Sequence, residues 1–329
     1  MTDLHDLDPT LRELDSKRAR VRIFTESEDD AFFYNRLIGP RIRQYVEFVD
    51  YAYGGINEGQ KGYHGAIISY RNAIKRQRQH NKREDLYRCL LDGHVSSIFG
   101  KTGLEIFDQV EPVFSLSCDT DARGTLFLNC NELENVCLLY SSAVTHLKHY
   151  LRVSNARAGA EVFFNSGQFG EAMERSLVYA AFNAASLRAR GQRVIGFMPQ
   201  NRHITDLEKP AADLEACARR IFRFRSKHYR SSTGSAPDPF KAEEDRRFRA
   251  YWKDIKKKFD EFSMTRVKDD PFHDQFLRLC DGKILMEWIL PERSGTWLKQ
   301  FLLEVVESEY AWRFQRALLN ELTAGLESS

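Results

Sequence analysis

Acidic side chains recur directly after β-prone runs in the first half of the chain. Glu26 follows residues 21–25, Asp92 follows residues 87–91, and Glu134 ends the segment NCNELE behind residues 126–128. In open α/β sheets, ligands bind at the carboxyl ends of the strands. Carboxylate oxygens suit Mg²⁺, and such a metal can polarise a phosphodiester and activate water. The spacing therefore predicts an acidic cluster at one sheet edge.

A helix is predicted immediately behind Glu26, over residues 29–38. Ser27 is a natural N-cap, and Asp29 and Asp30 fall in the first turn, where the helix dipole favours negative charge. This junction has two interpretations. Glu26 is either a metal ligand or general base, or an acid that only caps the helix.

Basic residues gather on the exposed side of a helix predicted over residues 64–78 and just beyond it. A charge run is usually a solvated helix face, but this one could also contact a phosphate backbone. The candidate nucleic-acid-binding residues are Arg71, Lys75, Arg76, Arg78, Lys82 and Arg83. Lys283, which follows Gly282, is a candidate phosphate contact at a helix start. A second basic segment, residues 219–230, contains aromatic residues and could either stack on bases or face a core.

The elements that must position these residues change in kind along the chain. Residues 21–26, 45–53, 87–91, 113–117 and 126–128 read as strands, and helical segments lie between them. This alternation predicts an α/β domain with a mostly parallel sheet flanked by helices, over residues 1–152. A long helix is expected over residues 133–151. Residues 153–329 contain only helical periodicities, which predicts an α-helical C-terminal domain.

Composition narrows the class of protein. The 329 residues carry a formal net charge of +2, which neither requires nor excludes a nucleic-acid partner. The six cysteines form no CxxC pair, so they are expected to be reduced core residues and not a zinc site. The polar N-terminus is unlike a signal peptide, and no apolar run is long enough to span a membrane. We therefore expect a cytoplasmic protein.

Several of these segments resemble the TOPRIM family. IFTESEDDAFFYNRL resembles the stretch with the opening glutamate of a TOPRIM domain, and LLDGH stands at the place of its aspartate motif. NELENVCLL and CDGKILMEWIL resemble segments of one branch of that family. This branch includes the TOPRIM nuclease effectors of bacterial anti-phage systems of the PARIS type. The resemblance covers residues 20–150 and, beyond them, only the second of these short motifs.

The resemblance implies roles for individual residues. Glu26 would be the general base or a metal ligand, Asp92 a metal ligand, and Glu134 a further acid at an Mg²⁺ or Mn²⁺ site. The family pattern usually has a second aspartate two residues after the first, where this chain has His94. His94 could be a substituted ligand, a proton donor or an inert surface residue. Asp119 and Asp121 could supply carboxylates, although aspartate in such a segment is also typical of a turn.

The leading functional prediction is a metal-dependent nuclease, the toxic effector of an abortive-infection system. The resemblance implies host tRNA or other RNA, slightly favoured over DNA, as substrate and an ABC or OLD-like ATPase as partner. The oligomeric state stays open, with a homodimer as one option. The alternative is a catalytically silent TOPRIM-like module that binds a partner ATPase or nucleic acid. A primase or topoisomerase fragment ranks last, because the chain lacks a zinc-binding cysteine set.

Overall fold

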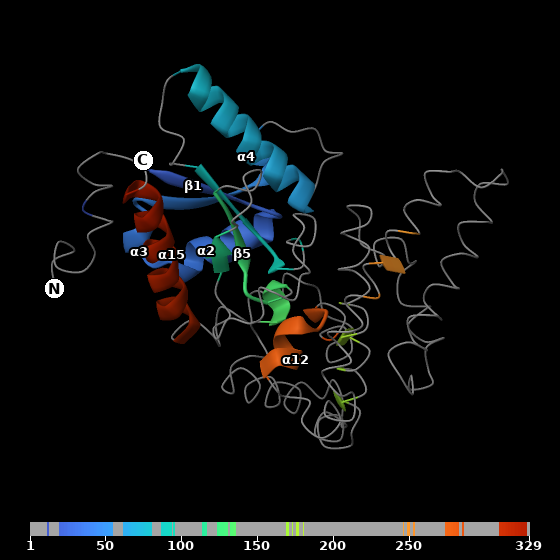
Figure 1. Cartoon of the computed structure of the whole chain (residues 1–329). Helices are drawn as coiled ribbons and strands as arrows, with labels where there is room; N and C mark the ends of the chain where they lie inside the picture. Colours follow the sequence, from blue (N-terminus) through green and yellow to red (C-terminus); the bar gives the residue numbers. More distant parts are fainter. Residues whose placement is uncertain are drawn as a thin grey trace.

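The fold is built on a five-stranded sheet with the strand order β2-β1-β3-β5-β4. Its strands are β1 (Val21–Thr25), β2 (Val46–Asp50), β3 (Tyr87–Leu91), β4 (Phe114–Leu116) and β5 (Thr125–Leu128). The first three strands and β5 run parallel, and β4 joins one edge antiparallel to β5. The prediction of a mostly parallel sheet flanked by helices is therefore confirmed (Figure 1).

The computed structural model describes part of the chain. The described residues are 12, 20–54, 62–80, 87–93, 95, 114–116, 124–130, 132–135, 169–170, 173, 176–177, 180, 246, 249–250, 253, 274–282, 285 and 309–327. No helix among them is long and apolar enough to cross a membrane.

Helix α4 (Gly62–Gln79) covers one face of the sheet (Figure 1). Its buried Ala66 and Tyr70 join a core cluster with Phe24 of β1, Val49 of β2 and Phe127 of β5. Successive side chains of a strand point to opposite faces, so the neighbours of these strand residues point away from α4. The side chains of the strands therefore contribute to two core layers, one on each face of the sheet.

The opposite face is covered by α2 (Glu28–Leu37) and the C-terminal helix α15 (Glu309–Glu327). Phe314 of α15 is fully buried and stacks on Tyr34 of α2, with ring centroids 5.2 Å apart. It also contacts Phe48 of β2 at 6.2 Å. Gln315 donates a hydrogen bond to the carbonyl oxygen of Leu37 at 2.8 Å. The end of the chain therefore packs on its first strand–helix unit. The division into domains at residue 152 stays a prediction.

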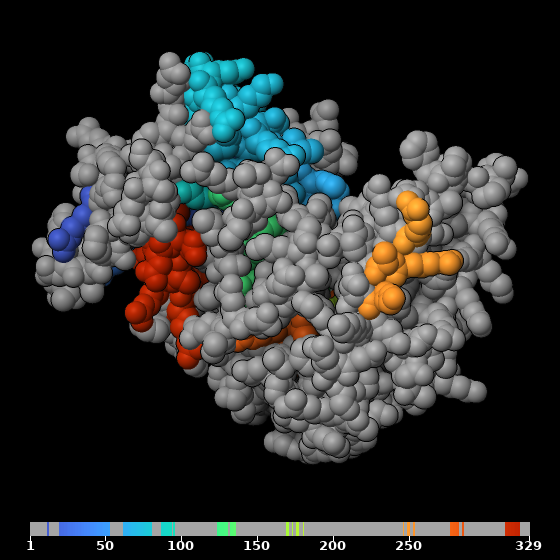
Figure 2. All heavy atoms as spheres, in the orientation of Figure 1, coloured from blue at the N-terminus to red at the C-terminus, as the bar shows by residue number. Residues whose placement is uncertain are grey.

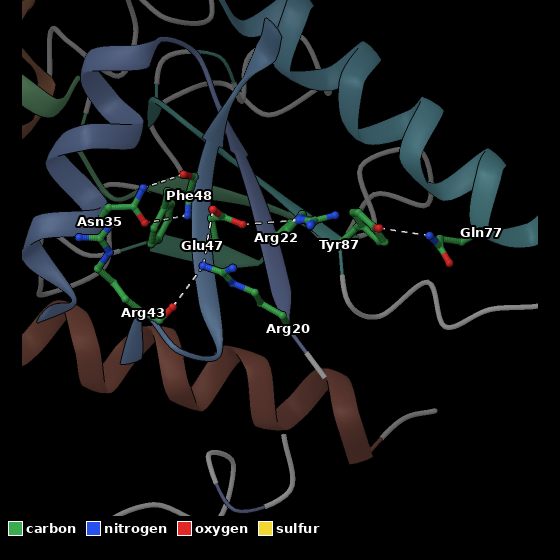
Figure 3. A network of polar contacts seen from close by, with 8 residues as sticks. All are labelled: Arg20, Arg22, Asn35, Arg43, Glu47, Phe48, Gln77 and Tyr87. Atoms are coloured by element: carbon green, nitrogen blue, oxygen red, sulfur yellow. Dashed lines mark hydrogen bonds and ion pairs between the residues drawn. The ribbon is translucent and has the colours of Figure 1, made fainter. Parts of the chain in front are cut away.

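A network of polar contacts lies near the amino-terminal ends of strands β1 and β2 (Figure 3). Glu47 of β2 lies opposite Arg22 of β1 and pairs with it at 3.6 Å, and with Arg20 at 3.5 Å. The Asn35 side chain binds both backbone groups of Phe48, accepting from its N–H at 3.0 Å and donating to its carbonyl at 2.7 Å. These contacts fix α2 and the β1–β2 register away from the carboxyl ends, where the candidate acids lie.

Two predicted elements differ from those observed. The second strand ends at Asp50 and not at residue 53, because a short 3-10 helix, η2 (Tyr51–Gly54), follows it. The Ser69 hydroxyl of α4 donates to the Tyr51 carbonyl at 2.6 Å, a tertiary contact that holds this turn. The helix expected over residues 133–151 begins as a 3-10 turn, η5 (Leu133–Asn135), and its remainder lies outside the described residues.

Candidate active site

Glu26 and Asp92 meet at the carboxyl edge of the sheet. They follow β1 and β3, which are adjacent parallel strands paired through Phe24 and Cys89. The Glu26 carboxylate accepts a hydrogen bond from the backbone N–H of Asp92, with Oε1 and N 2.9 Å apart. Both side chains are half-buried. The structure therefore brings these two predicted residues together, although they are 66 positions apart in the sequence.

Local hydrogen bonds fix the position of Glu26. Thr25, which precedes it, is fully buried, and its hydroxyl lies 3.2 Å from the carbonyl of Val49 and 3.1 Å from that of Ser27. The Ser27 hydroxyl oxygen accepts from the Asp30 N–H at 3.1 Å, so the predicted N-cap is confirmed. Because Ser27 already caps α2, Glu26 is not needed as the cap, which removes the simplest structural explanation for this acid.

The exit of β5 continues the same edge. The N–H of Gly93, next to Asp92, donates to the carbonyl of Cys130 at 3.1 Å. Beyond Cys130 the chain turns into η5, which places Glu134 in a buried position with 4% exposure. The Asp92 and Glu134 carboxylates both raise the pKa of the Cys130 thiol, so both lie in its neighbourhood. The three predicted acids therefore belong to neighbouring strand exits.

The thiols beneath this edge are protonated. Burial raises the pKa of Cys89 well above its usual value, and the Glu26 carboxylate raises it further. Burial, followed by Asp92, does the same for Cys130. Cys89, Cys130 and Cys280 are buried, as predicted for core cysteines. Since the thiolate is the reactive form, a raised pKa disfavours Cys89 and Cys130 as nucleophiles.

A group of buried polar residues behind Glu134 was missed by the sequence analysis. All are at most 4% exposed: Asn129, Glu132, Asn135, Ser176, Arg278 and Asp281. They come from three distant segments, the exit of β5, residues 169–180, and α12 (Asp274–Leu279) with the residues after it. Three of them, Glu132, Asn135 and Asp281, lie in the segments NELENVCLL and CDGKILMEWIL, but local periodicity does not show that these polar residues are buried.

The carboxylates at this edge of the sheet agree in part with a metal site. Carboxylates are the right ligands for Mg²⁺, which often takes one or two of them together with water and phosphate oxygens. Among the residues that the structure describes, no group of three or more His, Cys, Asp and Glu side chains could hold a metal ion. His94, Asp119, Asp121 and Lys283 lie outside the described residues. A site built on Glu26 and Asp92 therefore stays a prediction.

The basic face of α4 lies on the outside of the molecule, where α4 is drawn in cyan and blue (Figure 2). Arg71, Lys75, Arg76 and Arg78 are exposed. Lys82 and Arg83 lie outside the described residues. The exposure of the first four is compatible with contact to a polyanion, and it is equally typical of a solvated helix face.

No protein-family model, curated protein or solved structure matches this chain.

Proposed function

We propose that this chain is a TOPRIM-like, Mg²⁺-dependent nuclease that cleaves nucleic-acid phosphodiesters. One observation carries the proposal. Glu26 and Asp92 leave adjacent parallel strands at their carboxyl ends, and the Glu26 carboxylate bonds the backbone of Asp92 at 2.9 Å. This is where open α/β sheets bind ligands. The resemblance of IFTESEDDAFFYNRL and LLDGH to TOPRIM motifs supports the same two residues.

In this proposal both carboxylates bind the metal, and Glu26 also acts as the general base. Glu26 and Asp92 would hold Mg²⁺ or Mn²⁺, with Glu134 as a further acid beside them. The bound metal would polarise the phosphodiester and stabilise the leaving oxygen. The Glu26 carboxylate would also act as the general base that takes a proton from the attacking water. The backbone bond fixes the orientation of Glu26 before substrate arrives.

The exposed basic face of α4 would bind the phosphate backbone of the substrate. Lysine and arginine side chains on one helix face supply sequence-independent affinity, which weakens as salt concentration rises. By resemblance, we propose host tRNA or other RNA, slightly favoured over DNA, and a toxic role in anti-phage defence with an ABC or OLD-like ATPase partner.

The test uses purified full-length protein with labelled tRNA, messenger RNA and duplex DNA, each with Mg²⁺, with Mn²⁺ and with EDTA. We expect metal-dependent cleavage of at least one substrate. Glu26→Gln keeps the shape of the side chain but removes its basicity, so the cleavage rate should fall by about 10²-fold or more. Glu47→Gln is the matched control, because Glu47 lies in the network at the other end of the strands and pairs with Arg20 and Arg22.

Equal cleavage by wild type and Glu26→Gln would overturn the proposal. If neither protein cuts any substrate while binding persists, the silent binding module takes its place. Reversing the charges of Arg71, Lys75 and Arg76 separates nucleic-acid binding from cleavage. These substitutions should weaken nucleic-acid binding and flatten its salt dependence in either case, whereas Glu26→Gln should leave binding intact.

A further inference from the structure

Asn135 joins the exit of β5 to a segment about 140 residues further along the chain. Its side-chain amide nitrogen donates to the carbonyl of Leu277 at 2.6 Å and to that of Cys280 at 2.9 Å. Its amide oxygen accepts from the N–H of Glu132 at 2.9 Å. Asn135 is fully buried, so water does not compete for these bonds. Both amide donors are therefore committed to residues 277–280 and the acceptor to the acidic turn, residues 132–135.

The contact is tight on its other side as well. A Cβ atom at Gly282 would lie 2.6 Å from the Asn135 side-chain oxygen and 2.9 Å from its backbone nitrogen. No real Cβ approaches so closely without a shift of its neighbours. Asp281, next to Gly282, exchanges two bonds with Ser176, through its N–H at 3.1 Å and its carbonyl at 2.7 Å. Residues 277–282, which we call the docking segment, are thus fixed from two directions.

We propose that Asn135 is a positioning residue that couples the acidic turn to the docking segment, so that Glu134 holds its place at the sheet edge only while that segment stays docked. Glu134 precedes Asn135 within η5. Asn135 also closes this turn, because its backbone N–H donates to the Glu132 carbonyl at 3.1 Å while its side-chain oxygen accepts from the Glu132 N–H at 2.9 Å. The same side chain therefore shapes the turn that carries Glu134 and ties that turn to the docking segment. The effect on phosphodiester cleavage rests on the proposed function, and the coupling does not.

The coupling can be measured by hydrogen exchange with mass spectrometry on the full-length chain. Asn135→Asp has almost the same shape, but it places an acceptor-only carboxylate against the Leu277 and Cys280 carbonyls. We expect amide exchange to accelerate by about tenfold or more in peptides covering residues 129–136 and, equally, in those covering residues 274–286. Gly282→Ala perturbs the same contact from the docking segment and should accelerate the same two regions.

Asn35→Asp is the matched control. Asn35 also binds the backbone of another element through both ends of its amide, at Phe48. Asn35→Asp should accelerate amide exchange in α2 and β2 and leave exchange in residues 129–136 and 274–286 unchanged. Acceleration confined to residues 129–136 in Asn135→Asp would overturn the coupling. If Asn135→Asp does not fold, Gly282→Ala replaces it as the test. Faster exchange confined to residues 274–286 in that variant would then overturn the coupling.

A second measurement separates positioning from general destabilisation. Changes to residues that orient the ligands of a metal commonly cost about 10- to 100-fold in metal affinity or activity. We therefore expect the Mg²⁺ concentration for half-maximal cleavage to rise by about tenfold in Asn135→Asp and to stay unchanged in Asn35→Asp. An unchanged midpoint in Asn135→Asp would overturn the positioning role. If the wild type shows no cleavage, the proposed function fails, and the exchange experiment still decides the coupling.

Discussion

Gly124, just before β5, lies close to Tyr70 of α4. Its φ angle is +80°, and a Cβ there would lie 2.4 Å from the Tyr70 hydroxyl oxygen. Its carbonyl also accepts from the Cys89 N–H at 3.1 Å, so the backbone does not shift freely. Gly124→Ala should therefore destabilise the protein by more than the roughly 1–2 kcal/mol of a left-handed alanine alone. Urea unfolding followed by circular dichroism measures the change.

Gly39→Ala is the control for Gly124→Ala. Gly39 has a similar φ of +70°, but a Cβ there meets nothing within 4 Å. This substitution should cost only the backbone strain of about 1–2 kcal/mol. The difference between the two variants isolates the contact with Tyr70. Equal losses would show that α4 can move away from Gly124 at no cost.

The roles of single residues were predictable where they depend on near neighbours. Ser27 was found as an N-cap because capping acts over three positions, to Asp30. The positions of Glu26 and Asp92 at strand ends were predictable because each directly follows a short β-prone run. Asn135 was not found, because its partners are 142 and 145 positions away and no local pattern encodes them. Asp281 was missed for the same reason, since its contact with Ser176 spans 105 positions.

At the scale of elements, Phe314 packs α15 against α2 and the sheet. It is fully buried and lies against Tyr34 and Phe48, at centroid distances of 5.2 and 6.2 Å. Removing a buried aromatic ring of this kind costs about 3–5 kcal/mol, so Phe314→Ala should lower the free energy of unfolding by that amount. Denaturant unfolding checks it, with unfolding followed by tyrosine and tryptophan fluorescence.

Phe32→Ala on α2 is the matched control for Phe314→Ala. Phe32 is 51% exposed, and the Arg36 guanidinium lies 5.9 Å from its ring. Its loss should cost less than about 1 kcal/mol, the value of an exposed cation–π contact. A similar loss in both variants would mean that α15 contributes little through its buried face.

The extents of the elements were predictable where one local pattern dominates. The third strand was predicted over residues 87–91, the range observed for β3, because its run is continuous and bounded. The second strand was predicted too long, since its aromatic alternation continues past Asp50 while the Ser69 contact bends the backbone at Tyr51. Propensity describes the local chain, and the tertiary hydrogen bond decides where the strand ends.

For the whole molecule, alternation predicted a mostly parallel sheet but not its strand order. The order β2-β1-β3-β5-β4 makes Glu26 and Asp92 neighbours, and a different order would have separated them. Nor did the sequence indicate that α15 returns to the face formed by α2 and β2. Both features depend on contacts between distant segments. The resemblance to TOPRIM motifs pointed to both acids, and the strand order explains why they lie close together.

The return of α15 leads to a prediction about the division at residue 152. Among the side chains of α15 that the structure describes, four apolar ones are buried, namely Phe314, Leu318, Leu319 and Leu322. Each such side chain contributes about 1.5–3 kcal/mol, and typical domains are stable by only about 5–15 kcal/mol. A fragment of residues 1–152 also lacks the partners of Asn135 at Leu277 and Cys280. We therefore expect this fragment alone to lack cooperative unfolding and a dispersed amide NMR spectrum.

Appending residues 309–327 to that fragment through a flexible linker tests the cause. The added helix restores cover for Tyr34 and Phe48, so amide signals should disperse and a thermal transition should appear. The same fusion with Phe314→Ala should restore much less amide dispersion and a weaker thermal transition, because the Phe314 ring is buried. A folded, cooperative fragment of residues 1–152 without α15 would instead establish an independent N-terminal domain. The C-terminal helix would then be an addition to that domain and not part of its core.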